Sequence, residues 1–407
     1  MSGRWLSIIG LGEDGRAGLS TSANALIDAA ELIIGGRRHL DLIGTTPGEQ
    51  RTWSTPLDAT IPDLIAHRGR PVAVLASGDP FWYGAGVTLA RTIPCEEMLV
   101  IPAPSSLSLA AARMAWALQT TTTLGLNMRG LTPLLRPHLH HGQRILALSL
   151  NSDTPREVAS LLTQHGFGPT RMTVLEALGG PRERIRLTNA DRFTLTDIDP
   201  LNIIALDVVA GPTAHPIPYS SGLPDDLFEH DGQITKREIR AITLSSLAPA
   251  PGALLWDIGL GSGSVAIEWL LSHPTTRAIG IERDTERAAR ASRNAIALGV
   301  PHLDVRSGSA PEALTDLPSP DAIFIGGGGH SQSTIALCWS ALKPGGRIVM
   351  NAVTLETEAS LLAAHAQYGG TLTRISIDRA DPVGTRFGWR PAMPVMQWCT
   401  RKPERAS

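Results

Sequence analysis

The chain has 407 residues, more than one hydrophobic core usually supports, so we expect two domains. Hydrophobic residues make up 43% of it and the formal net charge is −2, which is ordinary for a globular protein. Because Lys and Arg are scattered, the composition excludes the concentrated positive charge of a nucleic-acid-binding surface. No apolar run approaches the ~18 residues of a membrane span, so no membrane association is expected.

The cysteines and the N-terminus indicate a cytoplasmic protein. Cys95, Cys338 and Cys399 are odd in number and far apart, so they form neither a disulfide framework nor a metal-binding pattern. The N-terminal sequence MSGRWLSIIG leads directly into a strand, without the layout of a signal peptide. We therefore expect no bound metal and a location in the reducing cytoplasm.

Short apolar runs rich in β-branched residues alternate with alanine- and leucine-rich segments at helical spacing along the whole chain. This alternation predicts α/β domains with largely parallel sheets. Helices are expected at Ala23–Ala30, Glu157–His165 and Thr285–Leu298. The expected strands are, in chain order, Leu6–Ile9, Leu32–Ile34, Val72–Ala76, Met98–Ile101, Arg144–Leu150, Met172–Leu175, Asn202–Leu206, Leu254–Ile258, Ala278–Ile281, Ala322–Ile325 and Arg347–Asn351.

The first strand leads into the loop GLGEDG at Gly10–Gly15, which has the spacing G-x-G-x-x-G. Taken alone, this loop indicates a dinucleotide site. The second strand, ELIIGG, however, ends in glycines where such a site needs an acid for the ribose. A dinucleotide site is therefore the weaker interpretation.

A second loop, LASGDPFWYGAG at Leu75–Gly86, is a more specific signal for ligand binding. Asp79 can accept hydrogen bonds from a ligand and Pro80 restricts the turn. Gly84 and Gly86 allow the backbone to approach a ligand closely.

Aromatic and hydroxyl side chains follow in the same region. Trp82 and Tyr83 either line a ring-sized cleft or simply pack. Ser105 and Ser106 precede a helix, where they cap its N-terminus, contact a ligand, or do both. A loss of periodicity near Gln119–Leu131 suggests that this half of the chain has two lobes.

Pro, Gly and Ser crowd together at Ala210–Asp226, where helical and strand periodicity disappear. This segment predicts the joint between the two halves of the chain. We expect a first domain at residues 1–208, a linker at 209–225 and a second domain at 226–407.

The most informative stretch is LLWDIGLGSGSVAIEWL at Leu254–Leu270, where Gly259, Gly261 and Gly263 follow a buried strand. Glycines there allow a sharp turn and close approach of a ligand. The next strand ends in Glu282, an acid that can accept hydrogen bonds from both ribose hydroxyls. Because the turn lacks the wider spacing that seats a pyrophosphate, it favours S-adenosylmethionine (SAM) over NAD.

Three later loops occur in the order expected for a SAM-dependent methyltransferase. They are GSAPEAL at Gly308–Leu314, DAIFIGGGGH at Asp321–His330 and LKPGGRIVMN at Leu342–Asn351. Enzymes that methylate base nitrogens usually place a Pro-Pro-aromatic motif after the fourth strand, where this chain has four glycines. Exposed backbone N–H groups fit a large anionic acceptor better than a stacked base.

With these motifs, the segment GLPDDLFEHDGQITKREIR and the loop WDIGLGSGSVAIEW resemble the decarboxylating methyltransferases of cobalamin (vitamin B12) biosynthesis. The N-terminal half is similar to the tetrapyrrole methyltransferases. Over nearly its full length the chain resembles the fused precorrin C5,15-methyltransferases. The resemblance implies a two-lobed tetrapyrrole methyltransferase fold followed by a Rossmann-like class I SAM methyltransferase domain.

The resemblance also implies the reaction and the partners. Two SAM molecules would methylate C5 and C15 of precorrin-6Y/6B, and loss of CO2 from the ring C acetate would give precorrin-8. The C-terminal domain would methylate C15 and decarboxylate, and the N-terminal domain would methylate C5. A homo-oligomer is expected on the same ground.

Candidate cofactor-binding residues are assigned by matching the family's motifs. Two departures stand out: Glu13-Asp14 replaces the family's Pro-Gly in the first glycine loop, and Glu282 stands where many relatives have Asp. The candidates are Gly78, Asp79, Pro80, Gly84, Ser105 and Ser106 in the first domain, and Thr235, Gly259, Leu260, Gly261, Ser262, Gly263, Glu282 and Ala310 in the second.

His230, Asp231 and Lys236 lie in the specific HDGQITK segment and are the candidates for assisting decarboxylation. The simpler alternative is that Asp231 caps a turn and Lys236 is solvated. Gly327 and Gly328 are candidate substrate contacts. Because the substrate carries many carboxylates, arginines should line its site. The available arginines are Arg237, Arg240, Arg379, Arg386 and Arg390, of which Arg386 is the chosen candidate.

Two alternatives remain at this point. One is an RNA methyltransferase, since related glycine loops occur among tRNA enzymes, although the near-neutral charge disfavours it. The other makes the N-terminal half a tetrapyrrole-binding module without catalytic activity. The Gly78-Asp79-Pro80 loop argues against a mere binding module, whereas the altered Glu13-Asp14 loop is compatible with one.

Overall fold

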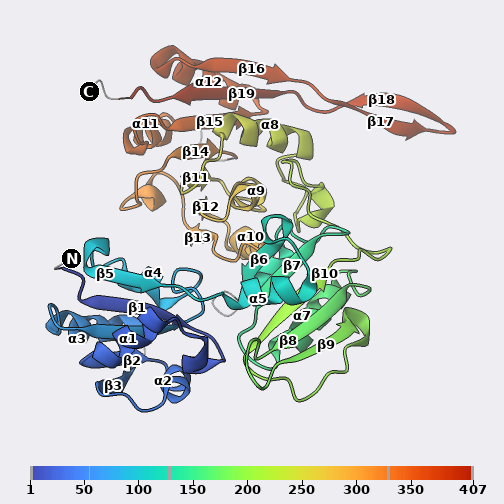
Figure 1. Ribbon diagram of the computed structural model, residues 1–407. Coiled ribbons are helices and arrows are strands. Elements are labelled where there is room, and N and C mark those ends of the chain that lie inside the picture. The colour runs from blue at the N-terminus through green and yellow to red at the C-terminus, as the bar shows by residue number, and fades with distance from the viewer. Residues whose placement is uncertain (1–2, 55, 127–129, 328–330, 405–407) are drawn as a thin grey trace. The chain divides into compact units, whose positions relative to one another are not determined.

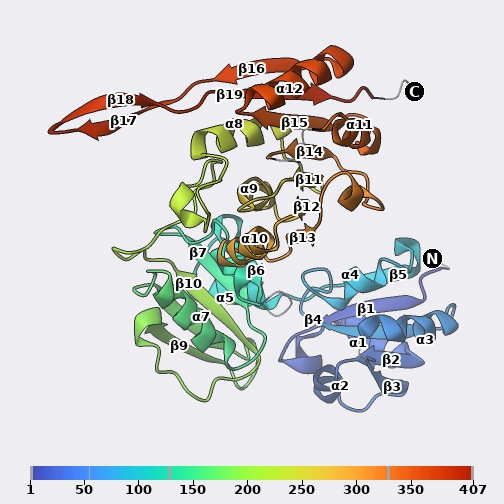
Figure 2. The same ribbon diagram turned by 180° about the vertical axis from the view of Figure 1, so that it is seen from behind.

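The computed structural model describes residues 3–54, 56–126, 130–327 and 331–404 (Figures 1 and 2). These residues divide into two compact units, each described by itself below. Unit 1 comprises Met1–Leu131 and His138–His215, and unit 2 comprises Thr132–Pro137 and Pro216–Ser407. Among the described residues, no helix is both long and apolar enough to cross a membrane.

The first sheet of unit 1 is parallel throughout, with strand order β3-β2-β4-β1-β5. All six residues of β1 are buried, as expected for a strand that lies between two neighbours and under helices on both faces. The strands are β1 Leu6–Leu11, β2 Leu32–Gly35, β3 Glu49–Thr52, β4 Val72–Ser77 and β5 Met98–Ile101; the helices are α1 Thr21–Ala29, α2 Arg37–Ile43, α3 Ile61–Ala66, α4 Ala85–Leu89 and α5 Ser106–Met114.

The second sheet of unit 1 has the order β6-β7-β10-β8-β9, in which the β6–β7 pair is parallel and the others are antiparallel. Helix α5 packs on this sheet, because its Leu107 and Ala110 share a hydrophobic cluster with Leu146 and Leu175. The elements are β6 Thr122–Gly125, β7 Arg144–Leu148, α7 Thr154–Gln164, β8 Arg171–Glu176, β9 Arg184–Asn189 and β10 Asn202–Asp207.

Unit 2 contains a sheet with the order β13-β12-β11-β14-β15-β19-β16, in which β19 is antiparallel to both neighbours and the other pairs are parallel. The strands are β11 Leu254–Ile258, β12 Arg277–Glu282, β13 Asp304–Ser307, β14 Ala322–Ile325, β15 Arg347–Ala352, β16 Thr371–Ile375 and β19 Val395–Arg401. The helices are α8 Arg237–Leu247, α9 Ser264–Ser272, α10 Thr285–Ala297, α11 Gln332–Ala341 and α12 Leu355–Tyr368.

Two further strands, β17 Asp378–Val383 and β18 Arg386–Pro391, form an antiparallel hairpin between β16 and β19. Both views show this hairpin extending away from the sheet of unit 2 (Figures 1 and 2). It carries large exposed side chains, including Phe387 and Trp389. The apolar-run pattern did not predict it, because charged residues, glycine and proline interrupt its apolar residues.

The prediction of α/β domains is confirmed. Largely parallel strands are found in the first sheet of unit 1 and in the sheet of unit 2, whereas the second sheet of unit 1 is mostly antiparallel. Three strands lie at the predicted residues: Met98–Ile101, Leu254–Ile258 and Ala322–Ile325. Local capping explains several helix starts. In α10, for example, the carboxylate of Asp284 accepts hydrogen bonds from the N–H groups of Glu286 and Arg287. The short segment at 132–137, placed by the sequence in the first domain, packs with unit 2 instead.

Candidate functional sites

The glycine turn of unit 2 connects β11 to α9 and leaves room for a ligand. Gly259 has a φ of +76°, and a Cβ there would lie 2.1 Å from the carbonyl oxygen of Gly327. The turn and the loop after β14 are therefore in direct backbone contact, which only glycine permits. Gly261, with a φ of +57°, meets nothing closer than 4.0 Å, so its outer face is open.

Glu282, at the end of β12, lies against this turn. One carboxylate oxygen accepts the N–H of Gly261 at 2.8 Å, and the other accepts the N–H of Asp284 at 3.0 Å. Its backbone carbonyl accepts the N–H of Gly308, which begins the loop that contains Ala310. The structure thus brings together three predicted elements: the glycine turn, the acid and the loop after β13.

Asp257, the last polar residue before the turn, is only 1% exposed. Its Oδ2 accepts the N–H of Ala266 at 3.0 Å, whereas its Oδ1 has no hydrogen-bond partner. Burial, aided by the negative charge of Glu282, raises the pKa of Asp257 to about 8. The carboxyl group is therefore mostly neutral at pH 7, a property that the sequence motif did not reveal.

These features fit the nucleoside part of SAM. The open face of Gly261 admits a flat or ring-shaped group, and a Cβ at Gly327 would also meet nothing within 4 Å. Each carboxylate oxygen has more than one acceptor position, so Glu282 can accept ribose hydroxyls while keeping its backbone contacts. Leu260 and Ser262 belong to the same turn and are buried beneath it.

The HDGQITK segment lies beside the glycine turn, as the carbonyl oxygen of Gln233 is 4.0 Å from the position of a Cβ on Gly261. Asn294 of α10 holds the two together. Its side-chain amide accepts the N–H of Glu229 and donates to the carbonyls of Glu229 and Ser262, at 2.8, 3.0 and 2.8 Å. Nothing in the spacing of the sequence identified Asn294.

The three catalytic candidates in this segment have different environments. Asp231 caps the N–H of Gln233 and pairs with Arg287 at 2.8 Å. These contacts, the N–H first, hold its pKa below the ordinary value, which makes it a poor proton donor. The exposed His230 accepts the N–H of Gly232 through Nδ1.

Lys236 is half-exposed, 3.9 Å from Asp225, and lines a surface hollow of about 440 Å³. Arg237 and Arg379 line the same hollow, and Arg379 pairs with Glu238 at 2.5 Å. Asp225 and Glu238 line it as well, so the hollow has three cations and two carboxylates, and its net charge is positive. Thr235 precedes Lys236, and its carbonyl accepts a hydrogen bond from Arg240.

The sequence offers Arg240 as one of five arginines available for substrate binding, but in the structure its side chain does not face a ligand site. Its side chain is fully buried and donates to Glu268 at 2.5 Å, to Asp225 at 3.0 Å and to the carbonyl of Leu223. Glu268 also accepts the N–H groups of Gly222 and Leu223 at 2.7 and 2.9 Å. Arg240 thus fixes the segment that precedes and contains the catalytic candidates.

The substrate-binding candidates lie apart from one another. Gly327 faces the glycine turn, whereas Gly328 falls outside the described residues. Arg386 is exposed near the tip of the β17–β18 hairpin, paired in register with Val383. Since the hairpin extends away from the sheet, unit 2 does not by itself bring Arg386 to the glycine turn (Figure 1).

Unit 1 contains a cavity of about 340 Å³ lined by loops from both of its sheets. Four cofactor candidates line it: Gly78, Gly84, Ser105 and Ser106. Asp79 and Pro80 are not among the lining residues, and Asp79 accepts the N–H of Phe81 at 2.9 Å, which stabilises the turn.

Ser105 serves as the N-cap of α5, since its hydroxyl accepts the N–H of Ser108 at 3.1 Å, and it also lines the cavity. Trp82 and Tyr83 line the cavity too, and their side chains remain about half exposed. Tyr83 has a φ of +56°, a strained conformation for a residue with a side chain. Capping by Ser105 is therefore confirmed, and its contact with a ligand stays a prediction that its place in the cavity lining supports.

Three buried polar atoms that line this cavity have no hydrogen-bond partner: Nδ1 of His39, Oγ of Ser149 and Oδ1 of Asn202. Burial, together with Arg38, lowers the pKa of His39 to about 4, so its imidazole is neutral. A buried polar atom without a hydrogen-bond partner destabilises the fold, and a bound ligand that supplies the missing partner removes this destabilisation. The three atoms come from both lobes of unit 1 and fit a polar ligand such as SAM, and sequence motifs did not identify any of them.

A glycine turn beside an acid at the end of the next strand is typical of a SAM-dependent methyltransferase, and comparison with known proteins agrees. Residues 6–194 match the family described as tetrapyrrole (corrin/porphyrin) methylases, and residues 226–402 match the precorrin methyltransferase domain. Among the described residues, no group of three His, Cys, Asp or Glu side chains is arranged as metal ligands would be.

The chain is 54% identical to the precorrin-6Y C(5,15)-methyltransferase [decarboxylating] of Sinorhizobium sp., over 98% of this chain and 96% of that protein. It is 40% identical to the Mycobacterium tuberculosis protein of the same name, over 97% and 99%. A cobalt-precorrin-6B C(15)-methyltransferase (decarboxylating) of Salmonella typhimurium is 31% identical, over 45% and 97%.

The chain therefore belongs to the family of decarboxylating precorrin-6Y C5,15-methyltransferases. This membership confirms the resemblance and the fold class, and it excludes the alternative of an RNA methyltransferase.

Proposed function

We propose that the chain methylates C5 and C15 of a precorrin and decarboxylates its ring C acetate, with one SAM site in each unit. The domain at 226–407 would methylate C15 and decarboxylate, the domain at 1–208 would methylate C5, and 209–225 would link them. The observations that support two sites are the cavity of about 340 Å³ in unit 1 and the open face of Gly261 beside Glu282 in unit 2. The Salmonella protein, matched by 45% of this chain, supports C15 methylation and decarboxylation within one unit.

SAM would supply an activated methyl group for transfer to a meso carbon in an in-line displacement, which requires no metal. The residues of the chain then contribute position and electrostatics. In unit 2, Glu282 would hold the ribose, and the Gly259–Gly263 turn would allow close approach. In unit 1, the backbone at Gly78 and Gly84, with Ser105 and Ser106, would contact the cofactor, and Asp79 and Pro80 would keep that loop in shape.

Decarboxylation requires a desolvated carboxylate and a proton for the carbon that remains. We assign these tasks to the HDGQITK segment of unit 2. Lys236, in the hollow that Arg237 and Arg379 also line, would bind the acetate, and His230 would deliver the proton. Asp231 would position both by fixing the turn, since its lowered pKa keeps it ionised.

The test is isothermal titration of S-adenosylhomocysteine into the full chain. Two sites per chain are expected, and a variant damaged in one glycine loop should retain one. A single site that survives substitution in unit 1 would show that unit 1 only binds tetrapyrrole. Absence of binding to either unit would contradict the proposed function.

We further propose that the protein is a cytoplasmic homo-oligomer in which the β17–β18 hairpin contacts a second copy. The strand register places Phe387 and Trp389 on one face of the hairpin with Pro382 and Ala380. Phe387 is 75% exposed and Trp389 is 77% exposed. Contact of such large apolar side chains with water is unfavourable in free energy, and a protein partner that covers them removes this contact.

Arg386 lies on the opposite face of the hairpin and would reach a substrate bound to the neighbouring copy. Replacing both Phe387 and Trp389 by Ser should lower the molar mass measured by light scattering. Arg386→Ala should weaken corrinoid binding and leave S-adenosylhomocysteine binding unchanged. Equal molar mass in the double variant would contradict the proposed interface.

A further inference from the structure

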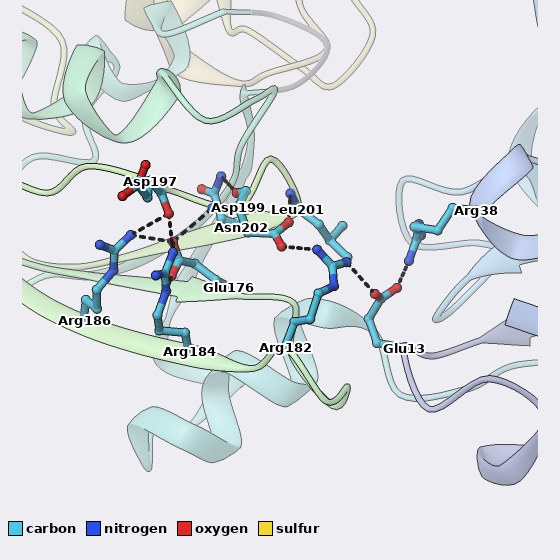
Figure 3. Close-up of polar contacts among 10 residues, drawn as sticks. All are labelled: Glu13, Arg38, Glu176, Arg182, Arg184, Arg186, Asp197, Asp199, Leu201 and Asn202. Atoms are coloured by element: carbon cyan, nitrogen blue, oxygen red, sulfur yellow. Dashed lines mark hydrogen bonds and ion pairs between the residues drawn. The ribbon is translucent and has the colours of Figure 1, made fainter. Parts of the chain in front are cut away.

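A chain of ion pairs joins the two sheets of unit 1 at the wall of its cavity. Glu13, in the first glycine loop, pairs with Arg38 of α2 and, at 3.4 Å, with Arg182 of the loop after β8. Arg182 also pairs with Asp199, which precedes β10. Figure 3 shows the carboxylate of Glu13 between the two guanidinium groups.

The Glu13 side chain is held firmly in this position. It is only 9% exposed, and a Cβ on Gly180 would lie 2.5 Å from the Glu13 Cβ, so the two loops are in close contact. Glu13 and Arg38 both line the cavity, whereas Arg182 does not. A carboxylate is thus held at the cavity surface by cations from both lobes.

Arg38 has the donors and the accessibility of a ligand-binding residue. Its guanidinium donates a hydrogen bond to Ser77 Oγ at 2.7 Å, and the Arg38 side chain is 35% exposed. Burial and the nearby charge of Arg182 lower the pKa of Arg38, so the positive charge of Arg38 is destabilised at this position. A neighbouring anion offsets this destabilisation. In the structure Glu13 is that anion.

Resting on the proposed function, we propose that Arg38 binds a carboxylate of the tetrapyrrole in unit 1, and that Glu13 occupies its place until the substrate enters. Arg38 presents a planar donor pair suited to carboxylates. The half-exposed rings of Trp82 and Tyr83 line the same cavity and suit the flat face of a macrocycle. Glu13 then acts as an internal competitor, and Arg182 with Asp199 retains it.

The test compares variants of the full chain with a stable polycarboxylic corrin, cobyrinic acid, and its neutral methyl ester, each titrated in the presence of S-adenosylhomocysteine. Glu13→Gln keeps the shape and hydrogen bonds but removes the competing charge, so affinity for the acid should rise about tenfold. Arg38→Ala should lower it about tenfold or more, and affinity for the ester should change little in both variants.

The double variant makes the test specific, because the gain from Glu13→Gln should disappear when Arg38 is also replaced. Glu49→Gln and Arg51→Ala are matched controls, since this exposed pair on β3 lies outside the cavity lining. Neither control should alter the affinity for the acid.

Two results would overturn the proposal. If Glu13→Gln weakens binding of the acid as much as Arg38→Ala does, Glu13 positions the arginine instead of competing for it. If neither variant changes the affinity, Arg38 does not bind a substrate carboxylate. If the variants show the expected affinities for the acid and the ester but unit 1 has no S-adenosylhomocysteine site, the carboxylate site is supported and the proposed function is contradicted.

Discussion

In both units a glycine loop follows the first parallel strand, but the second strand ends differently. In unit 2, β12 ends in Glu282, which contacts the glycine turn at the edge of a single sheet. In unit 1, β2 ends in Gly35, and the polar atoms that await a ligand come from His39 of one lobe and Ser149 and Asn202 of the other. If Glu282 holds the ribose as we propose, one sheet is sufficient to bind a nucleoside in unit 2, whereas the site proposed for unit 1 depends on both of its lobes.

The largest expected effect comes from substitutions that place a side-chain atom in one glycine loop and leave the other glycine loop unchanged. Gly259→Ala places a Cβ 2.1 Å from the Gly327 carbonyl oxygen and should abolish the site in unit 2 only. Gly78→Ala, 2.8 Å from the Cα of Ser105, should abolish the site in unit 1 only. Titration of S-adenosylhomocysteine should give one site in each variant. Gly252→Ala is the control, because it has a similar φ of +77° but open space.

Arg240→Gln should destabilise unit 2 by about 3–5 kcal/mol, because it leaves the buried Glu268 without its cation. Urea denaturation followed by circular dichroism would measure this loss. The control Arg293→Gln breaks the exposed pair with Glu229 and should cost less than ~1 kcal/mol. Equal effects of the two substitutions would mean that Arg240 does not anchor the segment.

Glu282→Gln sharpens the comparison between the sites, since unit 1 has no equivalent acid at the end of β2. Loss of the charged acceptor should weaken S-adenosylhomocysteine binding in unit 2 by roughly 10- to 100-fold, or ~1.5–3 kcal/mol. The site in unit 1 should keep its affinity. Glu286→Gln, on an exposed position of α10, is the matched control and should change neither site.

The last prediction concerns the pH dependence of stability. Because the pKa of Asp257 is raised to about 8 in the folded protein, the folded state binds more protons than the unfolded state between about pH 4 and 8. Its contribution to stability is therefore present at low pH and declines as the pH rises through this window. Asp257→Asn should make the decline shallower by up to ~1.4 kcal/mol per pH unit. An unchanged slope in denaturation at pH 5 and 7 would contradict the raised pKa.

Much of the fold could be predicted, because buried parallel strands are continuous apolar runs. The strand at Leu254–Ile258 is buried at every position and was located to the residue. The hairpin at Asp378–Pro391 could not be found in this way, since it is mostly exposed and contains no continuous apolar run. Strand β16, with exposed Thr371 and Arg374, was missed for the same reason.

The sequence by itself determined the two glycine loops, the acid Glu282 and the family, because these depend on short segments with fixed backbone requirements. Only the tertiary structure decided how charges are paired. It buried Arg240 with Glu268, 28 residues away, and joined Glu13 to Arg182, 169 residues away. The strength of an ionic contact depends on distance and burial, which spacing along a chain does not specify, so the roles of individual arginines became visible only in the folded protein.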